Sequence, residues 1–303
     1  MTEQLVVGVC GCGNMGAAIV TRLGGRVDLG VFDVDQDRRE AVALEAGATA
    51  IDSVAELGKR SNYVVLSLPN ATISRAVIRE LLESMVAGSV IVETSTVNPS
   101  DVEASHALCA AAGIHLVDAA ILSGVAQMAG GSSTLLVGGE PDDVAAASAV
   151  LDLIATDQVR LGRPGTGMAA KVGNNAVSHA VMVVLIEAIA MVSAAGVPMD
   201  VFANLLARPE AGLIRPLTHR IQERLATGDF EGGMPTEAAR KDSVLALELA
   251  QKHGIPLFAI QAAHVPYEIA VSSGLAREDY VAVARLWEQW TGRPFVDSVG
   301  ASE

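Results

Sequence analysis

Short apolar runs separated by segments of helical periodicity fill the first half of the chain. The runs are rich in Val, Ile and Leu, which is typical of strands buried in a sheet. They lie at residues 5–10, 29–32, 63–68, 90–93, 114–117, 134–137 and 158–161. Strands that alternate with helices form parallel sheets with helices on both faces. The pattern therefore predicts an α/β domain over residues 1–163, built on a doubly wound parallel sheet.

Beyond residue 163 the apolar positions recur with the period of an α-helix, and runs typical of strands nearly disappear. Glycine or proline follows most of the predicted helices, as expected at helix C-termini. The predicted helices cover residues 168–195, 199–207, 213–227, 237–253, 258–274 and 280–291. We therefore expect a second, all-helical domain over residues 164–303, which begins with a long interdomain helix.

This long helix carries the most apolar stretch of the chain. Residues 176–192 are almost wholly apolar and are interrupted mainly by His179 and Glu187. The stretch is shorter and more interrupted than the roughly 20 apolar residues of a membrane span. We therefore expect a buried helix and no membrane association. Lys171 stands at the start of this helix, and because an ammonium group is unfavourable to desolvate, it either reaches water or has a chemical function.

A glycine-rich turn follows the first predicted strand and precedes a helical segment. Its residues are Gly11, Cys12, Gly13, Asn14, Met15 and Gly16. Between a strand and a helix, this GxGxxG spacing is typical of a Rossmann-type domain that binds a dinucleotide. The first glycine allows a tight turn, the second lets the backbone approach the pyrophosphate, and the third lets helix and strand pack closely. For the motif alone, a tight turn without a ligand is an equally good interpretation.

Asp33 ends the second predicted strand, where an acidic side chain is placed to bind the ribose hydroxyls of adenosine. A carboxylate at this position repels a 2′-phosphate, so NAD is favoured over NADP. Arg38 and Arg39 follow shortly afterwards and leave NADP open, because either guanidinium can hold a phosphate. The structural alternative is that Asp33 and Asp35 cap the next helix.

Other predicted strands end in turn-forming or polar residues, at the edge where doubly wound sheets bind their ligands. Leu68, Pro69 and Asn70 follow one strand, and Thr96 follows the next. Ser123 and Gly124 come later and can offer a hydroxyl and a backbone N–H to a carboxylate. Each of these positions taken alone is more simply explained by ordinary turn chemistry.

Lys171 and Asn175 are four residues apart, so on a helix they share one face and can converge on one small ligand. His179 lies one turn further along. A packed histidine is the simpler interpretation, because no acid or nucleophile accompanies it. The chain shows no Ser/His/Asp arrangement and no metal-ligand spacing, so neither a hydrolase nor a metal site is expected.

The composition narrows the class of partner. The chain has 303 residues, is 50% hydrophobic and carries a formal net charge of −14. It is therefore globular, and so acidic a protein is a poor match for nucleic acid, whose phosphates need a basic face. We expect a small-molecule substrate. The three cysteines form no CxxC pair and we read no signal peptide, so reduced thiols in a cytoplasmic protein are expected.

Taken in order, these motifs resemble those of the β-hydroxyacid dehydrogenases, the family of 3-hydroxyisobutyrate dehydrogenase, tartronate semialdehyde reductase and 6-phosphogluconate dehydrogenase. The resemblance covers nearly the whole chain. It rests on residues 11–16, Leu68-Pro69-Asn70, Ser95-Thr96 with Pro99, Ser123-Gly124, Gly165-x-Gly167-x-x-x-Lys171-x-x-Asn174-Asn175 and Lys241-Asp242. It implies reversible hydride transfer between NAD or NADP and the carbinol carbon of a short, 3-hydroxyisobutyrate-like β-hydroxy acid, which becomes a semialdehyde.

The resemblance also implies roles for individual residues. Lys171 is similar to the catalytic lysine of the family, and Asn175 to its hydrogen-bonding companion. Ser123 and Gly124 correspond to the site of the substrate carboxylate. Thr96 and Lys241 correspond to positions beside the bound cofactor. The family is typically oligomeric through its helical domain, so a homodimer or homotetramer is expected.

One segment departs from the family pattern. Where the family has Asp-Ala-Pro-Val-Ser-Gly-Gly, residues 119–125 contain no proline, and Val125 takes the place of a glycine. A β-branched side chain cannot follow glycine to a positive φ angle, and it fills space near the expected carboxylate site. The departure leaves open a reductase of another carbonyl or imine. A dinucleotide-binding module without catalysis is a separate alternative, and the presence of Lys171, Asn175 and Lys241 together argues against it.

Overall fold

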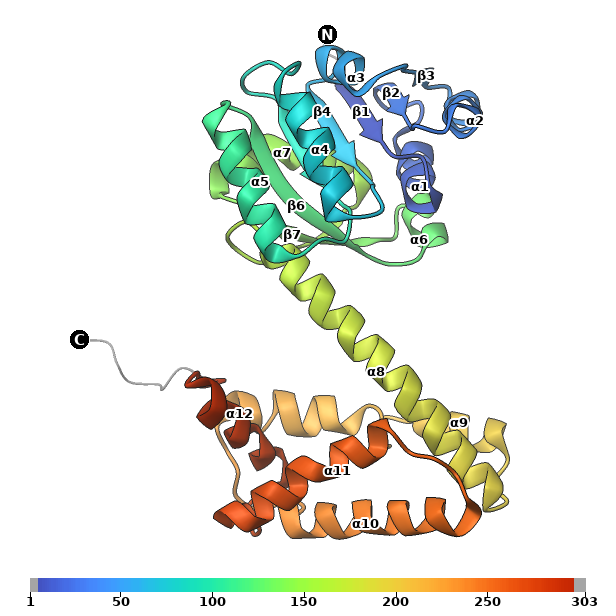
Figure 1. The fold of residues 1–303 in the computed structure, drawn as a ribbon, viewed down its shortest axis with the longest axis vertical. Helices are drawn as coiled ribbons and strands as arrows, with labels where there is room; N and C mark the ends of the chain where they lie inside the picture. The colour runs from blue at the N-terminus through green and yellow to red at the C-terminus, as the bar shows by residue number, and fades with distance from the viewer. Residues whose placement is uncertain (1–4, 297–303) are drawn as a thin grey trace, which may run out of the picture. The chain divides into compact units, whose positions relative to one another are not determined.

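The computed structural model describes residues 5–296 and divides the chain into two compact units, Met1–Ala176 and Val177–Glu303. Helix α8 (Thr166–Ala194) belongs to both, because the division falls within it (Figure 1). The predicted boundary after residue 163 precedes this helix. The first turns of α8, with Lys171, therefore belong to the compact unit that contains the sheet.

The first unit is built on one eight-stranded sheet with the order β3-β2-β1-β4-β5-β6-β7-β8. Its strands are β1 (Val6–Cys10), β2 (Asp28–Phe32), β3 (Thr49–Ala50), β4 (Tyr63–Leu66), β5 (Val90–Glu93), β6 (His115–Leu122), β7 (Thr134–Gly138) and β8 (Asp157–Arg160). The order from β3 to β6 is that of a dinucleotide-binding Rossmann sheet. In such a sheet the order in which the strands are added reverses between β1 and β4, although the two strands run parallel. The predicted α/β fold is confirmed.

One pair of strands departs from the prediction of a wholly parallel sheet. Strands β6 and β7 run antiparallel, and all other neighbouring pairs are parallel. The connection between them spans only residues 123–133 and contains the short helix α6 (Val125–Gly130), which was not among the predicted elements. A parallel crossover needs a dozen or more residues, so this connection is too short for one.

Helices cover both faces of the sheet (Figure 1). They are α1 (Asn14–Leu23), α2 (Gln36–Ala46), α3 (Val54–Arg60), α4 (Ala71–Leu82), α5 (Pro99–Ala111), α6 and α7 (Pro141–Ile154). Residues of α1, α2, α6 and α7 form one buried core with alternate strand residues such as Val92 and Val117. Residues of α3, α4 and α5 form a second core with the intervening residues such as Ile91 and Leu116. Each central strand is therefore apolar on both faces, as its sequence indicated.

The described part of the second unit consists of helices, with only an isolated bridge between Pro235 and Asp279. Its elements after α8 are α9 (Met199–Leu206), the π-helix η1 (Pro216–Gln222), the 3₁₀ turn η2 (Leu225–Thr227), α10 (Thr236–His253), α11 (Ala259–Ala270), the π-helix η3 (Val271–Leu275), the 3₁₀ turn η4 (Tyr280–Val283) and α12 (Ala284–Thr291). The prediction of a helical C-terminal domain is confirmed. The single helix predicted over residues 213–227 is wrong, because Pro216 lacks an N–H donor and the chain forms two short, irregular helices instead.

The expectation that the apolar run of α8 is buried is also wrong. Val177, Met182 and Ile186 have exposed fractions of 65%, 58% and 59%. By length and composition α8 would also qualify as a membrane span. Glu187 is the buried exception, and its carboxylate accepts the backbone N–H groups of residues 258–260 at 2.7–3.0 Å, at the start of α11. The apolar pattern of the sequence predicted burial, but within the described residues no other part of the chain covers these side chains.

Candidate cofactor and active site

The three glycines of the turn after β1 differ in the space around them. Gly11 has a φ angle of +99°, and a Cβ atom there would lie 2.2 Å from the carbonyl oxygen of Ser67. A Cβ on Gly16 would lie 1.9 Å from the carbonyl oxygen of Gly11. Gly13 has no other protein atom within 4 Å of its Cβ position. Gly11 and Gly16 are therefore required by the turn itself, whereas Gly13 leaves space in front of the N-terminus of α1, where a pyrophosphate fits.

Asp33 connects the end of β2 to this turn. Its carboxylate is almost completely buried and accepts the backbone N–H of Cys12 at 2.7 Å and that of Asp35 at 2.9 Å. The capping role falls to Asp35, which accepts the N–H of Arg38 at the start of α2. The Arg38 guanidinium lies 3.7 Å from Asp33 and 3.1 Å from Asp35. Because two carboxylates already face the Arg38 guanidinium, the end of β2 is a poor site for the 2′-phosphate of NADP.

A cavity of about 550 Å³ adjoins the glycine turn. Of the residues predicted to bind the cofactor, those that line it are Gly11, Gly13, Asn14, Met15, Asp33, Leu68 and Pro69. Cys12, Gly16 and Asn70 support the walls instead: Cys12 bonds to Asp33, Gly16 packs on Gly11, and Asn70 caps α4 by accepting the N–H of Ile73 at 3.0 Å. The open space at Gly13 and the acid at the end of β2 fit a dinucleotide.

The three cysteines are buried thiols. Cys10, Cys12 and Cys109 are free and buried. Burial raises the pKa of each thiol to about 12, so none is ionised near neutral pH.

A second cavity, of about 310 Å³, shares residues 67–69 and Met15 with the first. It is also lined by Thr94, Ser95, Thr96, Ile121, Ser123 and Lys171. Besides Met15, Leu68 and Pro69, the fold thus brings three further predicted site residues, Thr96, Ser123 and Lys171, to one pocket that adjoins the cofactor cavity. Apart from the Lys171 ammonium group, its polar lining is made of hydroxyl groups and backbone.

Lys171 enters this pocket from the second turn of α8. Its side chain is half-buried, and burial lowers the pKa of its ammonium group. Within residues 5–296 no carboxylate forms an ion pair with it. A lowered pKa and a free amine are the two properties that a lysine needs to act as a general base near neutral pH.

The position of Lys171 depends on Asp118, which the sequence analysis did not single out. Asp118 is fully buried on β6 and accepts the backbone N–H groups of Gly165 and Met168, each at 2.8 Å. A Cβ atom on Gly167 would lie 2.4 Å from the carbonyl oxygen of Leu136, so α8 begins in direct contact with the sheet. Burial raises the pKa of Asp118, and the backbone N–H groups oppose this increase. The available signal was a lone acid directly after the apolar run of residues 114–117, within what the structure shows to be the longer strand β6.

Three further predicted site residues, Asn175, Gly124 and Lys241, line neither cavity. Asn175 lies one turn beyond Lys171 and accepts a hydrogen bond from the Asn174 side chain at 3.4 Å. Gly124 is the N-cap residue of α6. Lys241 lies on α10 in the second unit, where its exposed side chain pairs with Asp242 at 2.9 Å. Their roles in catalysis and in binding stay predictions.

Comparison with known families agrees with this geometry. Residues 6–173 match the NAD-binding domain of 6-phosphogluconate dehydrogenase, and residues 165–287 match the NAD-binding domain of NADP-dependent 3-hydroxyisobutyrate dehydrogenase. The chain belongs to the β-hydroxyacid dehydrogenase family. As a β-hydroxyacid dehydrogenase it is an oxidoreductase with NAD as its cofactor, which confirms the sequence analysis on both points.

Characterised β-hydroxyacid dehydrogenases are similar to this chain over almost their whole lengths. The 2-(hydroxymethyl)glutarate dehydrogenase of Eubacterium barkeri is 30% identical, over 96% of this chain and 98% of the relative. The NAD-dependent L-serine dehydrogenase of Pseudomonas aeruginosa is 27% identical over 93% and 98%. The 3-sulfolactaldehyde reductase of Escherichia coli is 26% identical over 90% and 92%.

Solved structures show the same fold at lower identity. An imine reductase from Myxococcus stipitatus in complex with NAD⁺ has a TM-score of 0.84 and 20% identity, over 94% of this chain and all of that one. The 3-hydroxyisobutyrate dehydrogenase of Mycobacterium tuberculosis with L-serine has a TM-score of 0.66 and 23% identity, over 94% and 99%. The β-hydroxyacid dehydrogenase fold therefore hosts more than one kind of reduction.

Proposed function

We propose that this protein transfers a hydride between NAD and the carbinol carbon of a short β-hydroxy acid, converting the acid reversibly to its semialdehyde. The observation that carries the proposal is the common pocket of Lys171 and Ser123, which shares its wall with the cofactor cavity. A general base, a hydroxyl donor and the end of a dinucleotide site within one pocket are the parts that such a reaction needs.

In the direction of oxidation, the substrate hydroxyl loses a proton while its carbon loses a hydride. NAD, when bound, supplies the acceptor for that hydride. The neutral Lys171 amine takes the proton, and it returns the proton when the reaction runs towards the alcohol. Ser123 and the N–H of Gly124 bind the substrate carboxylate, and Asn175 orients the reacting hydroxyl. Thr96 and Lys241 are the remaining residues proposed to bind the cofactor.

The names of the relatives support the substrate class. The 2-(hydroxymethyl)glutarate, L-serine and 3-hydroxyisobutyrate of these names share a primary alcohol next to a carbon that bears a carboxylate. They differ in the third substituent of that carbon. In this chain Ile121 lines the substrate pocket, whereas Val125, the first residue of α6, is exposed and does not line it. The branched side chain of Ile121 favours a compact, apolar substituent, as in 3-hydroxyisobutyrate.

A panel of hydroxy acids tests this function. We expect NADH to form with at least one of 3-hydroxyisobutyrate, L-serine, glycerate and 2-(hydroxymethyl)glutarate. The absorbance of NADH measures this reaction. Because Asp33 repels a 2′-phosphate, kcat/KM with NAD should exceed that with NADP by more than about tenfold. NADH binding without turnover of any of these acids, but with reduction of imines or other carbonyls, would replace the proposal by a reductase. Binding with no turnover at all would leave a dinucleotide-binding module.

The exposed apolar residues of α8 support a homodimer or homotetramer in which a second copy covers this helix. Contiguous apolar side chains of this size are rarely left in water by a monomer. We expect a mass in solution of two or four chains, measured by light scattering after size exclusion. Met182→Glu, which places a charge on this surface, should shift the mass towards one chain, whereas Glu45→Gln on α2 should not. A monomeric mass for the unaltered protein would contradict this assembly.

The protein is proposed to act in the cytoplasm, without nucleic acid or membrane partners.

A further inference from the structure

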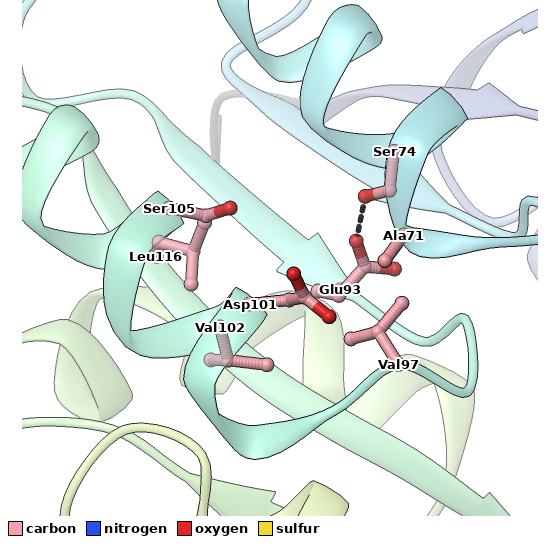
Figure 2. A pocket seen from close by; sticks show the side chains of 8 residues that line it. All are labelled: Ala71, Ser74, Glu93, Val97, Asp101, Val102, Ser105 and Leu116. Atoms are coloured by element: carbon pink, nitrogen blue, oxygen red, sulfur yellow. Dashed lines mark hydrogen bonds between the residues drawn. The ribbon is translucent and has the colours of Figure 1, made fainter.

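Glu93 is a buried acid that the proposed reaction does not use. It ends β5, its exposed fraction is 3%, and within residues 5–296 no cation forms an ion pair with it. One carboxyl oxygen accepts the backbone N–H of Ser95 at 2.8 Å. The other is hydrogen-bonded to the hydroxyl of Ser74, in the first turn of α4 (Figure 2). The carboxyl group therefore joins the end of β5 to the start of the helix that follows β4.

The two residues that follow Glu93 in the chain make hydrogen bonds to the turn after β4, which lines both pockets. The Ser95 hydroxyl accepts the backbone N–H of Leu68 at 2.8 Å. The Thr94 hydroxyl donates to the carbonyl oxygen of Leu66 at 2.6 Å. Leu68 lines both the cofactor cavity and the Lys171 pocket, and Thr94 and Ser95 line the latter. Glu93 thus lies directly behind the turns that form the common wall of the two sites.

The space around the carboxyl group is small and mostly apolar. A cavity of about 10 Å³ lies beside it, which is about the room that one water molecule needs. Figure 2 shows Glu93 among the side chains of Ala71, Val97, Val102, Leu116, Ser105 and Asp101. Solvation of a charge on Glu93 therefore depends almost wholly on Ser74 and on the N–H of Ser95.

The charged and titratable groups that face Glu93 do not neutralise it. Asp101 on α5 lines the same cavity, and its carboxylate is paired with Arg75 of α4. Asp118 is the register partner of Glu93 on β6, and the Cys10 thiol on β1 is uncharged. Burial raises the pKa of Glu93 to about 7, against the hydrogen bonds from Ser74 and Ser95, and the charge of Asp118 adds to the increase. Glu93 therefore changes protonation state near neutral pH.

We propose that Glu93 is a positioning residue whose ionised carboxylate fixes the turns after β4 and β5 in the form that binds the cofactor, and that its protonation releases them. The ionised group accepts both hydrogen bonds with charge assistance. The protonated group carries a donor on one oxygen, so its bond to Ser74 must reverse and its bond to the N–H of Ser95 loses that assistance. The inference rests on the proposed function for its effect on turnover, but NADH binding tests it alone.

The test compares NADH affinity, followed by fluorescence, at about pH 8.5 and about pH 6. If only the ionised form is competent, the unaltered protein should bind NADH about tenfold more weakly at the lower pH, because about one molecule in ten is then ionised. Glu93→Gln, which is never ionised, should bind NADH at both pH values at least as weakly as the unaltered protein does at pH 6. Glu45→Gln, an exposed glutamate on α2, should follow the unaltered protein. A constant affinity in the unaltered protein, or the same pH dependence in Glu93→Gln, would overturn the proposal.

Ser74→Ala tests whether the pH dependence of NADH affinity comes from Glu93, because a purely structural role of Glu93 would not shift the midpoint of that dependence. The Ser74 hydroxyl holds the pKa of Glu93 down, so its removal should move the decline in NADH affinity to higher pH. An unchanged midpoint would count against Glu93. Repeating the titration in Lys171→Ala removes the titration of the lysine, and the decline should persist. Turnover tests the role of Lys171 in the proposed reaction, and NADH binding tests the role of Glu93. The proposed function can therefore be contradicted while the proposal for Glu93 is supported. Melting curves for each variant show that it is folded.

Discussion

Lys171→Ala should lower kcat by a factor of about 10² to 10⁴ and leave NADH affinity unchanged. General acid or base catalysis contributes about this much, and alanine can neither accept nor return a proton. Lys171 lines the pocket with Ser123, whereas the glycine turn and Asp33 line the cofactor cavity. Steady-state kinetics with the best acid of the panel, together with NADH titration, checks both parts of this expectation.

Lys171→Arg should not restore turnover, because a guanidinium group stays protonated throughout the accessible pH range. In the unaltered protein the oxidation rate should rise with pH as the ammonium group loses its proton. Burial lowers the pKa of Lys171, so this rise should come below the pH at which a free lysine titrates. Lys59→Ala, an exposed lysine on α3, serves as the control. A Lys171→Ala variant with near-normal kcat would remove this residue from the mechanism.

Gly13→Val should weaken NADH binding at least about 100-fold without lowering the melting temperature. Gly13 has a φ angle of −65°, which valine adopts without strain, and the space at its Cβ position is open. The valine side chain would fill the region in front of α1 and exclude the pyrophosphate. Loss of one or two hydrogen bonds to a charged group, at about 1.5–3 kcal/mol each, accounts for a change of this size.

Two control variants at other glycines distinguish a loss of NADH binding from a loss of folding. Gly130→Val changes another open position without a positive φ angle, at the end of α6, and should leave NADH binding intact. Gly16→Ala should instead lower the melting temperature, because its Cβ atom would clash with the carbonyl oxygen of Gly11. NADH binding by Gly13→Val at normal affinity would show that the dinucleotide does not cross this turn.

The glycine turn beside the cofactor cavity could be predicted because its signals are local. A turn between a strand and a helix places Gly11, Gly13 and Gly16 within a few residues of one another, and the physical demand on each glycine is set by its neighbours in the chain. Lys171 could be singled out for a similar reason, since a cation at the start of an apolar helix is visible in the sequence. Asp118 and Glu93 were missed because their partners, Gly165 and Ser74, lie far from them in the chain.

The sequence by itself determined the alternation of strands and helices in the first half, the glycine-rich turn after β1 and the helical character of the second half, since hydrophobic period and turn chemistry depend on residues a few positions apart. It missed the two-residue strand β3 and the short helix α6. Only the tertiary structure decided the direction of β7, the exposure of the apolar side of α8 and the convergence of Ser123, Thr96 and Lys171 on one pocket. Strand direction depends on the length of a connection, and burial depends on which distant surface covers a side chain. Neither is encoded by residues that lie close together in the chain.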